Sequence, residues 1–264
     1  MKTLPTIVRT TALALATWVA AANPAAAQPP SRYYVAAAGG VERSRDTRLV
    51  DAACDGPDIL FFGCQAGTDG QQLGAAGDFG GSPVLELGVG VRLLRQLRAE
   101  VAVANAVGYS LEANANFLGA GSQQPATAEM SRLAVMARAI VDLTPLYVWR
   151  LEPFVGVGAG VSRQRLSGVT YEFPELSSQP STTATQGGRW RGAAWDGSAG
   201  VALRVTPRAR IDVTYRYTDA GHVETDPGTI EVVRGSRTLV IDGVGGTRAA
   251  LTSHAVLIGI RGTF

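Results

Sequence analysis

Hydrophobic and polar residues alternate one by one along eight segments of this chain. Residues 84–93 show the pattern most clearly, because apolar side chains fill every second position from Leu85 to Leu93. The positions between them carry glycine or charge. Successive side chains of a strand point to opposite faces, so this alternation predicts strands with one apolar face. The predicted strands cover residues 33–41, 84–93, 98–107, 131–143, 151–161, 195–205, 211–217 and 254–264.

The lengths of the strands and of their connections predict the architecture. Most of the strands are about ten residues long, the length that a tilted strand needs to cross a bilayer. Short turns alternate with long polar loops, a rhythm that is typical of outer-membrane barrels and that a soluble sandwich does not require. The pattern predicts an all-β fold, an eight-stranded antiparallel up-and-down transmembrane β-barrel with its termini on the periplasmic side. The short turns are 94–97, 144–150 and 206–209, and the long external loops are 42–82, 109–130, 162–194 and 218–250.

The polar face of these strands is rich in glycine, alanine and serine and carries charges of both signs. In a small membrane barrel this face fills a narrow interior, where opposite charges must pair because an unpaired buried charge is strongly disfavoured. The alternative is a sheet face exposed to water, because alternation alone does not separate the two. We predict an interior ion-pair network formed by Glu86, Arg92, Glu100, Arg138, Asp142, Glu152, Asp196, Arg204, Asp212, Arg216 and Arg261.

The N-terminal segment has the three parts of a secretory signal peptide. It begins with Lys2 and Arg9, continues with the apolar run 11–22 and ends in three alanines. The run is shorter than the roughly 20 apolar residues of a membrane helix, although an anchor that stays attached is the alternative. We expect cleavage after residue 27, which leaves 28–264 as the outer-membrane barrel domain with four long external loops.

Charge adds one exclusion. Removing Lys2 and Arg9 lowers the 24 basic residues to 22, which equals the 22 acidic residues. A near-neutral exported protein has no electrostatic reason to bind nucleic acid, so that class of partner is excluded.

Two cysteines, Cys54 and Cys64, lie close together in the first long loop. In an oxidising compartment such a pair predicts a disulfide that closes a small loop. Phe61 and Phe62 lie between the cysteines and are a candidate exposed contact point. The alternative is that the two rings fold back onto the rim of the barrel.

The sequence offers no catalytic constellation that we expect to work. Ser253 and His254 are adjacent, but neighbours on a strand point to opposite faces and cannot form a nucleophile–base pair. The glycine-rich stretch 156–160 lies within a predicted strand and is not followed by a helix, so it is not a phosphate loop. We expect no enzyme, no catalytic residues, no cofactor and no metal site.

Three stretches resemble the bacterial outer-membrane β-barrel domain proteins of the opacity and OmpA-like transmembrane type. They are Glu152-Pro-Phe-Val-Gly-Val-Gly-Ala-Gly160, Val213-Thr-Tyr-Arg-Tyr-Thr-Asp-Ala-Gly221 and the C-terminal Ser253-His-Ala-Val-Leu-Ile-Gly-Ile-Arg-Gly-Thr-Phe264. The resemblance implies that the barrel-assembly machinery recognises the last strand through its final aromatic residue, Phe264. The sequence departs from the family where Thr263 replaces the usual Tyr or Arg and Gly262 replaces the usual Tyr.

The functional prediction is an outer-membrane structural or interaction barrel with a plugged or narrow lumen. Its partners would be outer-membrane lipid, the assembly machinery, and a surface or host ligand reached through the loops. A small porin-like channel for ions or solutes is the alternative, although the interior of an eight-stranded barrel is normally filled by side chains. A lipopolysaccharide-modifying enzyme is the third reading. Aromatic residues near the strand ends agree with interfacial girdles: Tyr33, Tyr147, Trp149, Trp195, Tyr215, Tyr217 and Phe264.

Overall fold

The computed structural model describes residues 32–67, 70–143, 150–175 and 181–264, and its regular elements there are all β-strands. In this part of the chain no helix is long and apolar enough to cross a membrane. The strands are β1 (Tyr33–Ser44), β2 (Thr47–Asp51), β3 (Ala75–Asp78), β4 (Gly81–Arg92), β5 (Leu97–Ala115), β6 (Pro125–Asp142), β7 (Leu151–Leu166), β8 (Thr170–Phe173), β9 (Ser181–Ala184), β10 (Gly188–Arg204), β11 (Ala209–Glu224), β12 (Gly228–Arg234), β13 (Arg237–Val244) and β14 (Thr247–Thr263).

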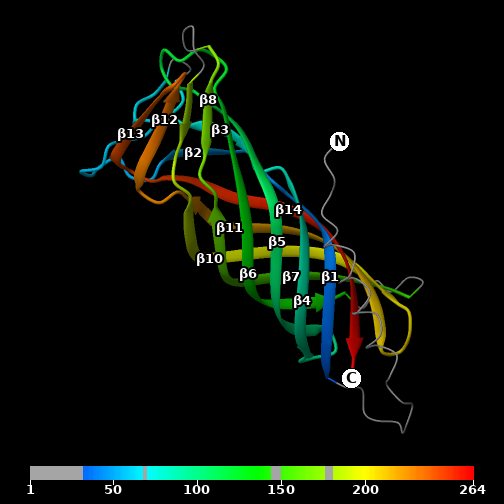
Figure 1. Cartoon of the computed structure of the whole chain (residues 1–264). Coiled ribbons are helices and arrows are strands. Elements are labelled where there is room, and N and C mark those ends of the chain that lie inside the picture. The colour runs from blue at the N-terminus through cyan, green and yellow to red at the C-terminus, as the bar shows by residue number, and fades with distance from the viewer. Residues whose placement is uncertain (1–31, 68–69, 144–149, 176–180) are drawn as a thin grey trace.

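Eight long strands close into a ring, and Figure 1 shows these strands from the side. Each pairs antiparallel with its neighbour in the order β1-β4-β5-β6-β7-β10-β11-β14, and β14 pairs with β1 to complete the circle. Closure leaves none of the eight with a free edge at the level of the ring. The eight-stranded antiparallel barrel expected from the sequence is confirmed.

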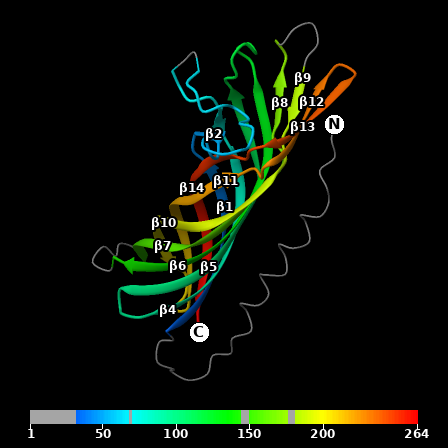
Figure 2. The same ribbon diagram turned by 90° about the vertical axis from the view of Figure 1, so that its left-hand side faces the viewer.

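The long strands extend further than the sequence predicted, and the large extensions lie on the side of the long connections. β5 continues to Ala115, and β10 and β14 already begin at Gly188 and Thr247. Six short strands, β2, β3, β8, β9, β12 and β13, pair with these extensions or with one another (Figures 1 and 2). The expectation that these segments are loops was therefore wrong. We call the six short strands, the described part of 52–74 and the strand ends that they pair with the outer tier.

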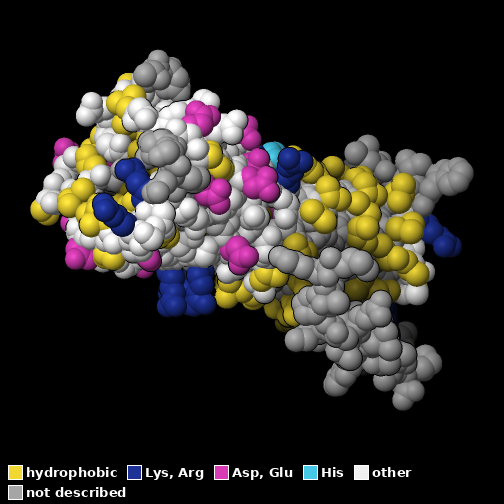
Figure 3. All heavy atoms as spheres, turned by 45° about the horizontal axis from the view of Figure 1, so that its top comes forward, with side chains coloured by type: hydrophobic (Ala, Val, Ile, Leu, Met, Phe, Trp, Pro, Cys, Tyr) yellow, Lys and Arg dark blue, Asp and Glu magenta, His cyan; other side chains and the backbone are white. Residues whose placement is uncertain are grey.

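The two ends of the ring have opposite polarity. Towards the short turns, the outward positions are apolar, and Leu85, Val157 and Ile258 are 70%, 67% and 62% exposed. Figure 3 shows hydrophobic side chains covering one end of the molecule, whereas the outer tier carries more polar and acidic surface. We call the exposed apolar side chains on the outward positions of the ring strands the belt. In the outer tier the inward positions are apolar instead, and residues such as Phe79 and Leu111 are fully buried.

A bulge in β5 contributes to this arrangement. Gly108 has a φ of 86°, and the pairing of β5 with β6 shifts register between Val107 and Tyr109. Because of the shift, Val107 points outward while Tyr109 is buried two residues later. Only glycine adopts this backbone conformation without steric cost.

Candidate functional site

Arg138 lies at the centre of the barrel interior and bonds to three acids. Its guanidinium lies 2.8 Å from Glu86, 2.8 Å from Asp196 and 3.5 Å from Glu100. Arg216 reaches the same Glu86 carboxylate at 2.6 Å. The five side chains come from β4, β5, β6, β10 and β11, so they connect the wall across the lumen. A cavity of about 50 Å³ beside this cluster has room for a few water molecules at most.

Further ion pairs lie at the end with the short turns. Asp142 accepts a hydrogen bond from Arg98 Nε at 3.0 Å and lies 3.6 Å from Arg92. Glu152 bonds to both Arg204 and Arg210, and Arg261 lies 3.1 Å from Asp212. Most of these side chains are buried. Each acid in this group has at least one arginine partner, as low-polarity surroundings demand.

A third group lies where the ring meets the outer tier. Arg132 pairs with the buried Glu42, and the hydroxyl of Ser253 donates to the same carboxylate. Each of the eleven charged residues predicted from the sequence forms an ion pair, and most are buried in the barrel interior, whereas the side chains of Arg92 and Arg204 are 33% and 48% exposed at the end with the short turns. The sequence prediction omitted four further members: Glu42, Arg98, Arg132 and Arg210.

The cause of those omissions differs between residues. Arg98 and Arg132 occupy the polar face of predicted strands, and Arg210 immediately precedes the predicted strand 211–217 in phase with its polar face, so their positions were available from alternation. Glu42 follows the predicted end of the first strand at residue 41 and was assigned to a loop. Since β1 continues to Ser44, Glu42 points inward in phase with the rest of the strand.

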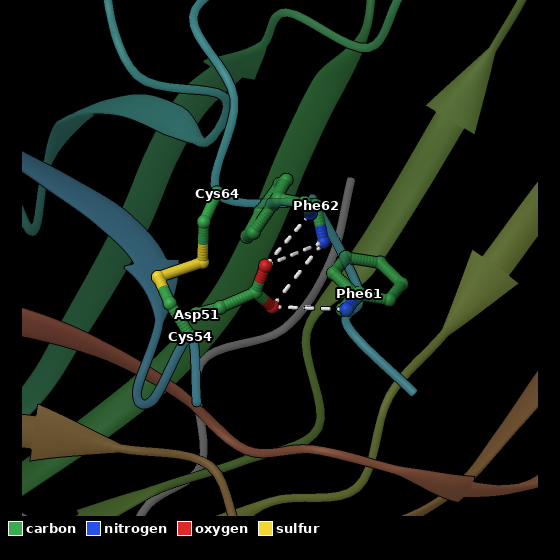
Figure 4. The surroundings of a disulfide bond; sticks show 6 residues. Asp51, Cys54, Phe61, Phe62 and Cys64 are labelled. Atoms are coloured by element: carbon green, nitrogen blue, oxygen red, sulfur yellow. Dashed lines mark hydrogen bonds between the residues drawn. A yellow bond between two sulfur atoms is a disulfide. The ribbon is translucent and has the colours of Figure 1, made fainter. Parts of the chain in front are cut away.

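The outer tier is built around a buried carboxylate. Asp51, at the end of β2, accepts hydrogen bonds from the backbone N–H groups of Phe61, Phe62 and Gly63, at 2.9, 3.1 and 2.7 Å. Cys54 and Cys64 are joined by a disulfide beside it (Figure 4), with their Cα atoms 5.9 Å apart. These contacts hold the segment between the cysteines against β2. Sequence reasoning missed Asp51, because nothing local marks it as an acceptor for a segment ten residues away.

Phe61 and Phe62 are not an exposed contact pair, so that expectation was wrong. Phe62 is only 5% exposed, and Phe61 packs edge-on against Phe117 with ring centroids 5.4 Å apart. Both rings also contact Tyr171 of β8. Burying two large aromatic side chains is worth several kcal/mol, which decides in favour of the folded-back alternative.

Tyr171 is fully buried in this aromatic cluster, and its hydroxyl has no hydrogen-bond partner among the described residues. Burial, reinforced by the nearby Asp51 carboxylate, raises the pKa of the Tyr171 phenol. The neutral form is favoured because the protein surroundings solvate a phenolate poorly.

An apolar recess of about 290 Å³ opens beside the cluster. Ile59 and Leu60 line it from the disulfide-closed segment, Phe117 from the β5–β6 connection, and Val232 and Ile241 from β12 and β13. Ile59 is 54% exposed, so the recess is accessible from outside. Its lining is the kind that receives an apolar group.

The remaining predicted residues lie on the outer wall. Trp195, Tyr215 and Tyr217 form one aromatic group with His254, and the Tyr215 hydroxyl lies 2.6 Å from His254 Nδ1. The adjacent Ser253 points inward and donates to Glu42, so Ser253 and His254 lie on opposite faces of β14. Tyr147, Trp149 and the expected signal peptide at 1–27 lie outside the described residues.

Phe264 is 66% exposed at the end of β14, where its backbone N–H donates to the Tyr33 carbonyl. Within the described ranges, no group of three or more His, Cys, Asp or Glu residues could hold a metal ion.

Comparison with known families decides what kind of barrel this is. A family model described as the outer membrane protein beta-barrel domain matches residues 11–235. This chain belongs to that family. The apolar belt is the surface that such a barrel presents to lipid, and the protein is located in the bacterial outer membrane.

Solved structures of outer-membrane proteins are similar over most of the barrel. Neisserial surface protein A has 15% sequence identity and a TM-score of 0.46, over 90% of this chain and 100% of that one. OprG from Pseudomonas aeruginosa has 13% identity and a TM-score of 0.49, over 89% and 98% of the two chains. The outer membrane protease OmpT from Escherichia coli has 11% identity and a TM-score of 0.46, over 91% and 99%. No curated protein sequence matches this outer-membrane barrel.

Proposed function

We propose that this outer-membrane barrel is a closed scaffold that holds a rigid outer tier at the cell surface, where the tier contacts surface or host molecules. The observation that supports closure is the Arg138 cluster, in which Glu86, Asp196 and Arg216 meet across the lumen. A solute would have to separate these ion pairs in order to pass. Removing one partner from a buried pair costs about 3–5 kcal/mol, so spontaneous opening is rare.

The contact role rests on the construction of the outer tier. Long loops of a barrel are usually its least ordered part. Here six short strands, the Cys54–Cys64 disulfide and the Asp51 hydrogen bonds fix those segments. A surface that is ordered before binding loses less conformational entropy when a partner docks.

Within the tier, the recess between Ile59, Leu60 and the β12–β13 hairpin is the proposed contact point. It takes the place of the exposed phenylalanine pair expected from the sequence. An apolar side chain or acyl group of the partner would fill it, since apolar burial is the main driving force that such a lining offers.

Closure is tested by single-channel recording of the mature protein, refolded in detergent and inserted into a planar bilayer. The expected result is insertion without conductance steps. A matched variant, Glu86→Ala with Arg138→Ala and Arg216→Ala, removes the central plug and should conduct. Steady stepwise openings of the unmodified protein would overturn the closed scaffold and favour the channel.

The contact role is tested by adherence of cells that display the protein. Replacing Ile59 and Leu60 with serine should weaken adherence, while the same replacement of the exposed Leu239 and Val240 on β13 serves as the control. Ile59 and Leu60 are 54% and 37% exposed, Leu239 and Val240 are 60% and 56% exposed, and the control pair does not line the recess. Equal adherence of both variants and the parent protein would remove the recess from the proposal.

We also infer that the barrel-assembly machinery recognises Phe264 during biogenesis. The side chain is exposed on the outward face of the last strand and is free for recognition. Phe264→Ala should reduce the amount of folded barrel in the outer membrane, and Thr263→Ala is the neighbouring control. Unchanged assembly of both variants would refute this role.

A further inference from the structure

Four arginines form a compact square on the outward wall of the barrel. In the register of β7 with β10, Arg163 lies opposite Arg191 and Arg165 lies opposite Arg189. All four arginine side chains are exposed on the outward face. The residue between the two arginines of β7, Gln164, is buried and points inward. Opposite partners on a sheet are about 5 Å apart, and next-but-one neighbours on a strand are about 7 Å apart. The square therefore concentrates four positive charges on a small area.

The square lies directly beyond the belt. The outward positions of β7 are apolar from Leu151 to Val161, and the next outward residues are Arg163 and Arg165. That apolar run spans about 25 Å along the membrane normal, for a strand that rises about 3.3 Å per residue and tilts by about 40°. This is the height of the apolar band of an outer-membrane barrel. The arginines consequently lie at the depth of the outer headgroup layer and point sideways into it.

The surroundings of the square support this placement. Trp195 and Tyr217, in contact at a centroid distance of 5.3 Å, lie on the outward face of β10 and β11 nearer the belt. Such aromatic pairs are typical of the membrane–water boundary. Figure 3 shows basic side chains gathered where the hydrophobic surface ends.

The charges of the square are not neutralised by the protein. Glu129, Asp219 and Glu224 lie on the neighbouring strands, but in the described ranges no acid comes within 4.0 Å of any of the four guanidinium groups. Like charges directly opposite on a sheet are destabilising. This contrasts with the interior, where every arginine of the network has a carboxylate partner. A bound external anion would offset this repulsion.

We propose that the square formed by Arg163, Arg165, Arg189 and Arg191 binds the phosphate groups of an outer-leaflet lipid. Guanidinium groups bind phosphate through paired N–H donors, which makes arginine better suited to this ligand than a point charge. The acyl chains of the same lipid would lie against the belt below. A headgroup with two phosphates would contact both opposed pairs, Arg163 with Arg191 and Arg165 with Arg189. This site is independent of the contact role proposed for the outer tier.

The test uses the purified, folded protein in detergent micelles, titrated with lipid A that carries two phosphates. Dephosphorylated lipid A and phosphatidylcholine are the comparison lipids, and native mass spectrometry counts the lipids bound. The variant Arg163→Gln with Arg191→Gln removes one opposed pair. The matched control is Arg234→Gln with Arg237→Gln, which removes another exposed opposed pair at the tip of the β12–β13 hairpin, remote from the belt.

We expect the unmodified protein and the control to retain bisphosphorylated lipid A, and the Arg163/Arg191 variant to bind it about tenfold more weakly. Arg163→Lys with Arg191→Lys should bind with intermediate strength, because it keeps the charge and loses the paired donors. Folding of each variant is checked by its heat-dependent gel mobility.

Three results would overturn the proposal. Equal lipid binding by the variant and the parent would show that the square does not bind the headgroup. An equal loss of lipid A binding by the Arg234/Arg237 control would show that the effect depends on the net charge of the protein and not on the square. Soluble heparin is titrated in parallel as a polyanion that carries no acyl chains. If the Arg163/Arg191 variant lost heparin binding and kept its lipid A binding, the square would be assigned to a soluble polyanion instead.

Discussion

The belt and the outer tier share the same strands but have opposite polarity. On β7, Val161 faces outward in the belt, and the next outward residue is Arg163. On the inward side the change runs the other way, from the polar Gln164 to the buried Leu166. The alternation of inward and outward residues continues without interruption along β7, and what changes is which of the two faces is apolar.

The polarity of each strand face therefore depends on whether lipid or water surrounds that level of the barrel, and not on the strand itself. Where lipid lies outside, apolar side chains face outward and charges must pair within the lumen. Where water lies outside, the tier behaves as a soluble domain and buries its apolar side chains. Substitutions in the barrel interior, the belt and the tier should therefore differ in their effects.

Arg138→Ala should have the largest effect. It leaves Glu86 and Asp196 buried without their central partner, and it should lower the free energy of unfolding by about 3–5 kcal/mol. Denaturant titration of the refolded protein in lipid vesicles measures the change. Arg43→Ala is the control, because Arg43 is exposed and belongs to no ion pair among the described residues. Equal effects of the two substitutions would contradict the structural role of the network.

A charge on the outward face should be costly in the belt and harmless in the tier. Val157→Arg places a guanidinium near the bilayer midplane and should destabilise the barrel by about 2–4 kcal/mol. Thr127→Arg places the same group on an exposed outward position of β6 in the tier, where a change within about 0.5 kcal/mol is expected. The same vesicle titration compares them, and similar costs at both sites would remove the distinction between the regions.

Replacing Cys54 and Cys64 with serine should loosen the tier and leave the belt intact. The disulfide closes a loop with a sequence separation of 10, so its loss should destabilise the tier by about 2–3 kcal/mol. Limited proteolysis should then cut between residues 52 and 63, while the barrel keeps its heat-dependent gel mobility. Loss of that mobility would show that the two regions fold as one cooperative unit.

Tyr171→Phe should have the smallest effect at neutral pH. It removes a buried hydroxyl that lacks a partner among the described residues, so the tier should keep its stability or gain up to about 1 kcal/mol.

The pH dependence of the same variant follows from the raised pKa of Tyr171. Burial of a neutral phenol contributes stability fully below the unfolded-state pKa of about 10, and this contribution decreases as the pH rises above that value. Protease resistance of the parent tier should therefore fall above pH about 10 more steeply than that of the phenylalanine variant. Identical pH profiles would contradict burial of a neutral phenol.

The sequence was sufficient to predict the belt and most of the interior. Its strands have apolar residues at every second position, and lumen residues such as Arg138 and Glu152 follow directly from that phase. The tier was not predictable in this way. Once β1 leaves the belt, Arg43 and Glu42 are both charged, so a strand and a polar loop look alike even though one side chain points out and the other in.

The contacts within the tier were not predictable from the sequence for a related reason. Phe61 and Phe62 contact Asp51, Phe117 and Tyr171. These three residues belong to three different connections, 42–82, 109–130 and 162–194. Apolar residues in a loop indicate that something is buried or bound, but they do not indicate which. Only the pairing of the short strands brings these residues together.

Spin labels placed singly along the outward face of β7 test the change of polarity most directly. The positions are 155, 157, 159, 161, 163 and 165, in the protein reconstituted in vesicles. Residues up to Val161 should be accessible to oxygen dissolved in the bilayer and shielded from a water-soluble nickel complex, and the preference should reverse at Arg163 and Arg165. Uniform accessibility to the nickel complex along the whole series would contradict a strand that passes from lipid into the aqueous outer tier.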